Sequence, residues 1–230
     1  EVNVTNAATI ETIGLLDIAT AFTVGGTATF RSSDLDIGGG TTGVDTLRLY
    51  TQDGTTQMNI GTDGSAGNWE LTDAEFARLS ATTAWNVGES GTQSGQIRLQ
   101  TAAAPTALND VPLQIASNND AGGGSRTVYL DDDTSGTPGT AFATGGSANI
   151  TILAGMGGVT GNATDDTYAE VSTTGTIDIT SSGAVGSSTN RISFPAGQDE
   201  VTVSTNAGGG DDVYIHGLGA LTLGKSGVAV

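Results

Sequence analysis

Aspartates gather in three glycine-rich stretches of the chain, and carboxylates in such turns are typical ligands of calcium. Calcium takes several oxygen ligands from carboxylates and carbonyls on flexible loops. The sequence therefore predicts candidate calcium sites, with the alternative that these turns are only solvated acidic loops. The candidate ligands are Asp131, Asp132, Asp133, Asp165, Asp166, Asp211 and Asp212.

A second kind of chemistry would be polysaccharide cleavage, which needs two carboxylates beside one bond or a base that removes a proton. Asp36, Glu70 and Asp178 lie between two apolar residues in short alternating segments, as do Arg48 and Arg98. These residues are far apart in the sequence, so the sequence alone places no pair of them on one face. His216 is the only histidine, no nucleophile-elbow motif accompanies it, and it is expected in a turn after Ile215. We expect a protein that is not an enzyme, with a polysaccharide-active enzyme as an alternative.

The charge of the chain excludes several partners. It carries 25 acidic and 7 basic residues, a net charge of -18. Binding to nucleic acid or to an anionic membrane needs clusters of Lys and Arg, so neither is expected. No apolar run reaches the roughly 18–20 residues that span a bilayer, so membrane insertion is not expected either. The chain has no cysteine.

The elements that would position these residues are very short strands. Two apolar residues repeatedly flank one that is usually polar, which predicts a strand with one buried and one wet face. Gly, Asp, Asn, Ser and Thr separate these triplets, as in tight turns. The triplets occupy residues 35–37, 47–49, 58–60, 69–71, 85–87, 97–99, 113–115, 128–130, 150–152, 177–179, 192–194, 201–203, 213–215 and 221–223.

Such brief strands with turns on every side favour an all-β parallel β-helix, a β-solenoid in which stacked coils share one narrow core. A tandem antiparallel β-sandwich is the alternative. At roughly 20–25 residues per coil, about ten coils would give a rod on the order of 50 Å long. Residues 1–230 are expected to form a single elongated segment, part of a longer chain or a stacking subunit. Residues 71–79 are expected to be a bent strand, with a one- or two-turn helix capped by Thr72 or Asp73 as the alternative.

The chain resembles the β-strand-repeat regions of large secreted bacterial adhesins of the filamentous haemagglutinin type. The similarity lies in residues 69–79, which read Trp-Glu-Leu-Thr-Asp-Ala-Glu-Phe-Ala-Arg-Leu, and in the segments 85–88 and 95–99 that follow. The resemblance implies a right-handed parallel β-helix, export from the cell and a role in adhesion. The segment 208–215 also partly resembles the glycine-rich calcium repeat of RTX proteins, although it does not recur in tandem.

These observations predict a secreted, extracellular protein of the cell surface, whose stiff rod attaches the cell to a surface. Its expected partners are neighbouring solenoid coils, copies of itself placed end to end, and a host-cell or matrix surface that includes carbohydrate. The alternatives are a subunit of a homopolymeric surface filament and a viral tail fibre.

Overall fold

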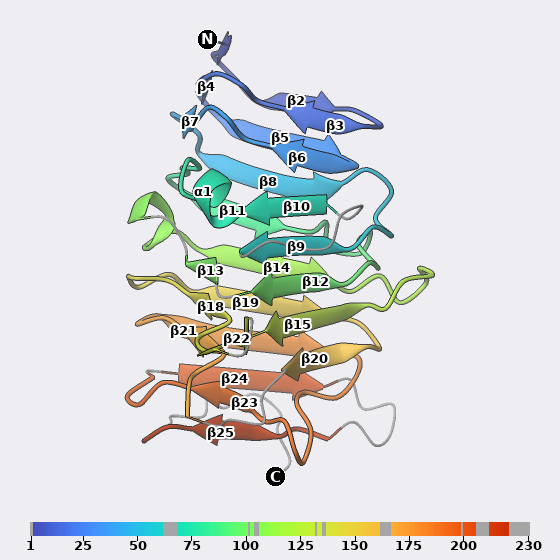
Figure 1. The fold of residues 1–230 in the computed structure, drawn as a ribbon, viewed down its shortest axis with the longest axis vertical. Coiled ribbons are helices and arrows are strands. Elements are labelled where there is room, and N and C mark those ends of the chain that lie inside the picture. The colour runs from blue at the N-terminus through green and yellow to red at the C-terminus, as the bar shows by residue number, and fades with distance from the viewer. Residues whose placement is uncertain are drawn as a thin grey trace.

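Strands form where apolar residues flank a polar one, because alternate side chains of a strand point to opposite faces of its sheet. In the triplet 47–49 both leucines are buried and Arg48 is exposed. The computed structural model describes residues 2–61, 69–100, 102–103, 106–131, 133–134, 137–161, 167–198, 200–205 and 212–220. Figure 1 shows their strands stacked as rungs along the long axis, with the first strands at one end of the stack and β25 (Ile215–Gly217) at the other.

The longest sheet, called the first face, contains eight strands, and each pairs in parallel with a strand from the next turn of the chain. In order, they are β2 (Ala8–Glu11), β5 (Thr27–Ser32), β8 (Thr46–Thr51), β11 (Ala84–Val87), β14 (Leu113–Ser117), β19 (Ile150–Ala154), β22 (Thr176–Ser181) and β24 (Glu200–Thr205). Leu47 pairs with Ala28, 19 residues before it, and with Trp85, 38 residues after it. Coils therefore differ in length because the turns between strands carry inserts. Eight strands at about 4.8 Å spacing make this sheet about 34 Å long.

The second face follows the first along the chain. Its strands are β3 (Leu15–Asp17) paired with β6 (Asp34–Asp36), and then β10 (Trp69–Thr72), β9 (Met58–Gly61), β12 (Ile97–Gln100), β15 (Thr127–Asp131) and β20 (Gly158–Gly161). Parallel bridges from Val159 to Val185 and from Val185 to Val213 continue this face toward the C-terminus.

The third face consists of shorter pairings that return the chain to the first face. Its strands are β1 (Val2–Val4), β4 (Phe22–Val24) and β7 (Thr41–Thr42), then β13 (Ala102–Ala103), β18 (Phe142–Ala143) and β21 (Val171–Ser172), and finally β23 (Ile192–Phe194) and β25 (Ile215–Gly217). We call one passage through the three faces a coil. In the described part of the chain, only the hairpin of β16 (Asp133–Thr134) and β17 (Thr137–Pro138) pairs antiparallel. This parallel pairing disagrees with the antiparallel sandwich, whose sheets would consist of antiparallel strands.

One pair of strands departs from the sequence order. Strand β10 follows β9 in the chain, yet β9 pairs with both β10 and β12, while β10 lies against β6 (Figure 1). The backbone N–H of Glu70 in β10 donates to Asp34 Oδ1 of β6, at 3.2 Å. The chain thus places β9 between β10 and β12, one strand position further along the stack, and then returns to place β10 beside β6.

A one-turn helix, α1 (Asp73–Phe76), follows β10, so the expected bent strand at residues 71–79 is wrong and the alternative is right. Thr72 and Glu75 form a capping box: Glu75 N donates to Thr72 Oγ1 at 3.4 Å, and Thr72 N donates to Glu75 Oε2 at 2.8 Å. Phe76 and Leu79 are buried in the core, which supplies the stability that so short a helix lacks by itself. A 3-10 turn covers Thr106–Leu108.

The core is one cluster of buried apolar side chains that runs through the stack from Ile18 to Val203. Aromatic residues fill its centre, where Trp85 lies 5.1 Å from Phe76 and 6.2 Å from Phe142 between ring centroids. Trp69 and Trp85 are fully buried, so both side chains fill the core. The all-β chain with mostly parallel sheets is consistent with a β-solenoid. Among the described residues, no helix is long and apolar enough to cross a membrane.

Candidate functional site

Asp131, one of the predicted calcium ligands, is held by a neighbouring strand. It ends β15, is 1% exposed, and accepts hydrogen bonds from Arg98 Nε at 2.9 Å and Gln100 Nε2 at 3.1 Å. Arg98 Nη2 also contacts this carboxylate, and the guanidinium lies 5.2 Å from the Tyr129 ring centroid. The carboxylate of Asp131 therefore neutralises a cation of the protein itself.

The other predicted calcium ligands are only partly described. The backbone of Asp133 lies in β16, and exposed Asp212 accepts a hydrogen bond from Tyr214 Oη at 3.0 Å. The side chain of Asp133 lies outside the described residues, as do Asp132, Asp165, Asp166 and Asp211. Within the described ranges, no three His, Cys, Asp or Glu side chains group as a metal site requires. Calcium binding by these turns stays a prediction.

Other turn aspartates join one coil to the next. Asp110 Oδ1 accepts hydrogen bonds from Ser147 N at 2.8 Å and Ser147 Oγ at 3.0 Å, and these bonds hold the pKa of Asp110 below its usual value. Asp120 accepts from Met156 N at 2.8 Å and from Ser182 Oγ at 2.7 Å. An acidic turn residue here supplies acceptors for the N–H and O–H groups of later coils. This role accounts for aspartate in turns without any ligand.

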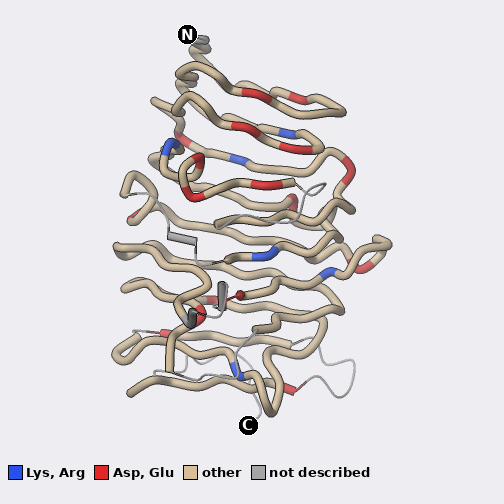
Figure 2. The backbone as a smooth tube through the Cα atoms, viewed as in Figure 1, with Lys and Arg blue, Asp and Glu red and all other residues tan. Residues whose placement is uncertain are grey.

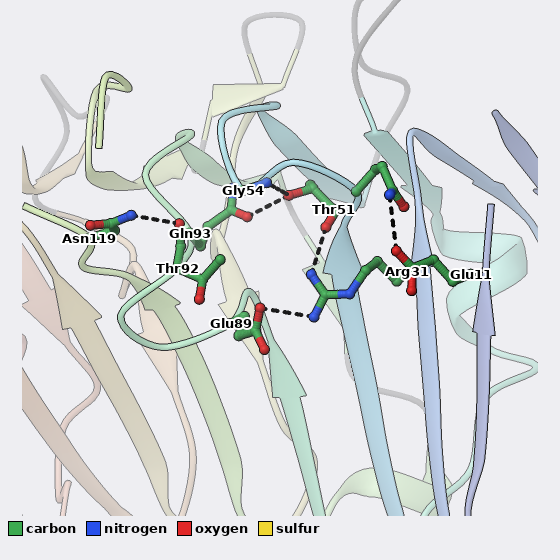
Figure 3. Close-up of polar contacts among 9 residues, drawn as sticks. Glu11, Arg31, Thr51, Gly54, Glu89, Thr92, Gln93 and Asn119 are labelled. Carbon is green, nitrogen blue, oxygen red and sulfur yellow. Dashed lines mark hydrogen bonds and ion pairs between the residues drawn. The ribbon is translucent and has the colours of Figure 1, made fainter. Parts of the chain in front are cut away.

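A chain of polar contacts joins first-face strands at the corner where they turn toward the second face (Figure 3). Arg31 of β5 forms an ion pair with Glu89, at 2.9 Å, and donates to Thr51 O at 3.3 Å. Thr51 Oγ1 donates to Gln93 Oε1 at 2.7 Å and accepts from Gly54 N at 3.1 Å. Because each contact links residues from different turns of the chain or closes a tight turn, the network fixes the coils relative to one another.

A hollow lined by several carboxylates lies where β6, β10 and α1 meet. It has a volume of about 260 Å³ and is open to solvent. Four carboxylates and two leucines contribute most of its lining. The lining residues are Leu15, Asp34, Leu35, Asp36, Glu70, Thr72 and Glu75. We call it the acidic hollow.

Two of these carboxylates hold the backbone in place. Asp34 Oδ1 accepts from Leu35 N at 2.9 Å and from Glu70 N at 3.2 Å, which ties β6 to β10. Glu75 Oε1 accepts from Ile37 N at 2.9 Å, while its other oxygen takes part in the capping box. Neither residue was predicted to be part of a site, although the Thr72-x-x-Glu75 spacing is the sequence signal of a capping box.

The electrostatics of the acidic hollow centre on Asp36. Loss of hydration, the neighbouring Glu75 and Asp17 carboxylates and a hydrogen bond with Glu75 raise the pKa of Asp36, and Arg78 partly opposes them. Close carboxylates favour sharing a proton or attracting a cationic group. That is the chemistry this arrangement can supply.

The residues proposed for polysaccharide cleavage are divided between two faces. Asp36 and Glu70 line the same hollow, a proximity that the sequence did not reveal. Asp178 in β22 and Arg48 in β8 are exposed on the first face, while Arg98 on the second face is paired with Asp131. The predicted turn position of His216 is wrong, because it lies half-buried in β25, paired with Ser193.

Fold and geometry define an all-β protein of parallel stacked coils. No protein-family model matches the chain, and neither a curated protein nor a solved structure does so. The similarity to filamentous haemagglutinin-type adhesins therefore stays a prediction.

Proposed function

We propose that the protein is an extracellular structural and adhesive component, a stiff right-handed β-solenoid rod that attaches a cell to a surface. The observation that carries the proposal is the uninterrupted parallel register from β2 to β24 over one continuous core. Bending such a stack would separate strand edges and open the core, so it resists bending. Its role is structural rather than catalytic.

The first face supports the adhesive part of the proposal. Its outward side chains form a column of cross-strand neighbours that are mostly uncharged and polar. They are Thr9, Arg48, Asn86, Gln114, Thr151, Asp178 and Thr202, while Thr29 in the same column is buried. Hydroxyl and amide groups held at the strand spacing of about 4.8 Å can bond to a repeating carbohydrate or matrix surface.

The surface charge suits a protein in water. Figure 2 shows Asp and Glu spread over the length of the stack, with few Lys or Arg among them. A net charge of -18 favours solubility in water. It also favours neutral or cationic surfaces as partners over anionic ones.

The proposal is tested with beads that carry the purified chain. Beads should adhere to cells or matrix polysaccharide, and Asn86→Ala combined with Gln114→Ala should reduce this adhesion. The matched control combines Thr174→Ala with Ser188→Ala, which are exposed positions outside that column. Adhesion no greater than that of beads carrying an unrelated acidic protein would refute the adhesive role.

Localisation and assembly have separate tests. An antibody against the chain should label intact source cells, and labelling only after lysis would contradict an extracellular role. The alternative function, a subunit of a homopolymeric filament, predicts a band near 22.8 kDa from the purified fibre under denaturing conditions. A segment of one giant adhesin predicts a band of several hundred kilodaltons.

A further inference from the structure

Met156 is an exposed methionine at the corner where one coil turns from the first face to the second. The chain has two methionines. Met58 in β9 is fully buried, whereas Met156, between β19 and β20, is 64% exposed. Among the described residues, four large apolar side chains are exposed, and this is the one that carries sulfur. An oxidant in the surrounding water can therefore reach one thioether and not the other.

The backbone around Met156 is fixed although its side chain is exposed. Met156 N donates to Asp120 Oδ1 at 2.8 Å, and Gly155 N donates to Ser117 O at 2.8 Å. On the other side, a Cβ on Gly183 would collide with Met156 O, so the next coil packs directly against this turn. The sulfur therefore belongs to a corner that both neighbouring coils hold in place.

Arg126 of the preceding coil lies beside this sulfur. Its Nη1 donates to Asp120 O at 2.9 Å and to Met156 Sδ at 3.9 Å, and its Nε is buried without a hydrogen-bond partner. Among the described residues, Arg126 is also the only non-glycine residue with a positive φ, +56°. Such a strained backbone persists only where the surrounding structure fixes it. The guanidinium is thus held next to a thioether, which is a weak hydrogen-bond acceptor.

We propose that Met156 is a modification site, where hydrogen peroxide converts the thioether to a sulfoxide whose oxygen accepts a hydrogen bond from Arg126. The lone pair of Met156 Sδ attacks one peroxide oxygen, so that an S–O bond forms and the O–O bond breaks. The proton of the transferred hydroxyl moves to the departing hydroxide, which leaves as water. Sulfur is oxidised and the peroxide is reduced, so the step needs no further reactant.

The sulfoxide oxygen forms where a donor is already in place. Because N–H···O bonds span about 2.7–3.2 Å, an oxygen bonded to Sδ on the side of Arg126 comes within reach of Nη1. The new bond would join the turn before β15 to the turn before β20, and these strands belong to consecutive coils. Sulfoxide formation disrupts packed methionines, but Met156 is exposed. Oxidation should therefore stabilise this corner of the stack.

Mild treatment of the purified 230-residue chain with hydrogen peroxide tests the site. Mass spectrometry of its peptides should find one added oxygen on Met156 while Met58 is still unmodified. Denaturation by urea should give a ratio of folded to unfolded chain about fivefold higher after oxidation, the effect of one hydrogen bond. Met156→Leu removes the sulfur at similar volume, so peroxide should leave its stability unchanged. In Arg126→Leu, oxidation should bring no gain, because the donor is absent.

Three results would overturn the inference. They are oxidation of Met58 as fast as that of Met156, an oxidised wild type that is no more stable than the untreated one, and a gain in Arg126→Leu as large as in the wild type. If circular dichroism shows that Arg126→Leu does not fold, Arg126→Gly replaces it, because glycine adopts a positive φ without strain and has no guanidinium. A gain that Met156→Leu shares would come from another residue and would also refute the assignment to Met156.

Discussion

Gly88 and Gly91 provide a matched pair of substitutions that measures how closely successive coils approach. Both have a positive φ, +74° and +75°. A Cβ on Gly88 would lie 2.2 Å from Ala116 O of the next first-face strand and 2.6 Å from Ile97 Cδ1. A Cβ on Gly91 would meet nothing within 4 Å. Alanine at either position adopts a strained backbone, but only Gly88→Ala also collides with a neighbouring coil.

The expected costs follow from these contacts. A left-handed backbone costs a non-glycine residue about 1–2 kcal/mol, which is the expected destabilisation by Gly91→Ala. Forcing atoms into a packed region adds about 1–3 kcal/mol or more, so Gly88→Ala should lose about 2–5 kcal/mol. The backbone oxygen of Ala116 cannot rotate away as a flexible side chain would. Denaturation by urea, followed by circular dichroism, measures both free energies of unfolding.

The difference between the unfolding free energies of Gly88→Ala and Gly91→Ala tests how closely the coils approach. If Gly88→Ala costs no more than Gly91→Ala, the coils do not approach each other as described. Gly197→Ala is a second control, because Gly197 has a φ of +78° and no atom within 4 Å of its Cβ position. It should match Gly91→Ala within about 0.5 kcal/mol.

Four further outcomes are expected. Asp131→Ala should destabilise the fold by about 1–3 kcal/mol, because Arg98 loses its buried carboxylate but can reach water; a double-mutant cycle with Arg98→Ala that shows no coupling would contradict the ion pair. Asp36→Asn should raise the melting temperature at pH 7, because a raised folded-state pKa means that ionised Asp36 disfavours folding; the gain should vanish below pH 3.8, and its persistence in acid would exclude this cause. The pKa of Asp110 is lowered instead, which means that ionised Asp110 favours folding. The stability that it contributes above pH 3.8 should disappear as the pH falls through its folded-state pKa. Asp110→Asn should therefore make the free energy of unfolding depend less on pH in that range. If the predicted acidic turns bind calcium, a chelator should lower the melting temperature, and an unchanged melting curve would refute the calcium prediction.

The alternation of apolar and polar residues was sufficient to predict most strands. Each such triplet needs only its own residues to show which side is buried, as Leu47, Arg48 and Leu49 do. The helix at Asp73–Phe76 was expected only as the alternative to a bent strand, because its local signals are weak in so short a segment. Its formation depends on distant partners, which are the core around Phe76 and Leu79 and the contact between Glu75 and Ile37.

The acidic hollow could not be predicted because it is assembled from different coils. Asp36 and Glu70 are 34 residues apart, and their proximity depends on β10 lying beside β6. No local pattern reveals which strand takes that place. The ion pair of Asp131 could not be predicted for the same reason, since Arg98 reaches it only through the β12–β15 register.

The reversed order of β9 and β10 has a consequence for how the chain folds. Both strands show the same alternation, Met58-Asn59-Ile60 and Trp69-Glu70-Leu71, so β6 offers β9 a competing docking place until β10 emerges. A chain that folds from its N-terminus cannot complete this level coil by coil, because β9 must wait for a strand that comes later. In the folded chain, the bond from Glu70 N to Asp34 holds β10 in that place. We expect correct docking of β10 to be a slow step of folding, because premature docking of β9 at β6 would shift the register of the coils that follow.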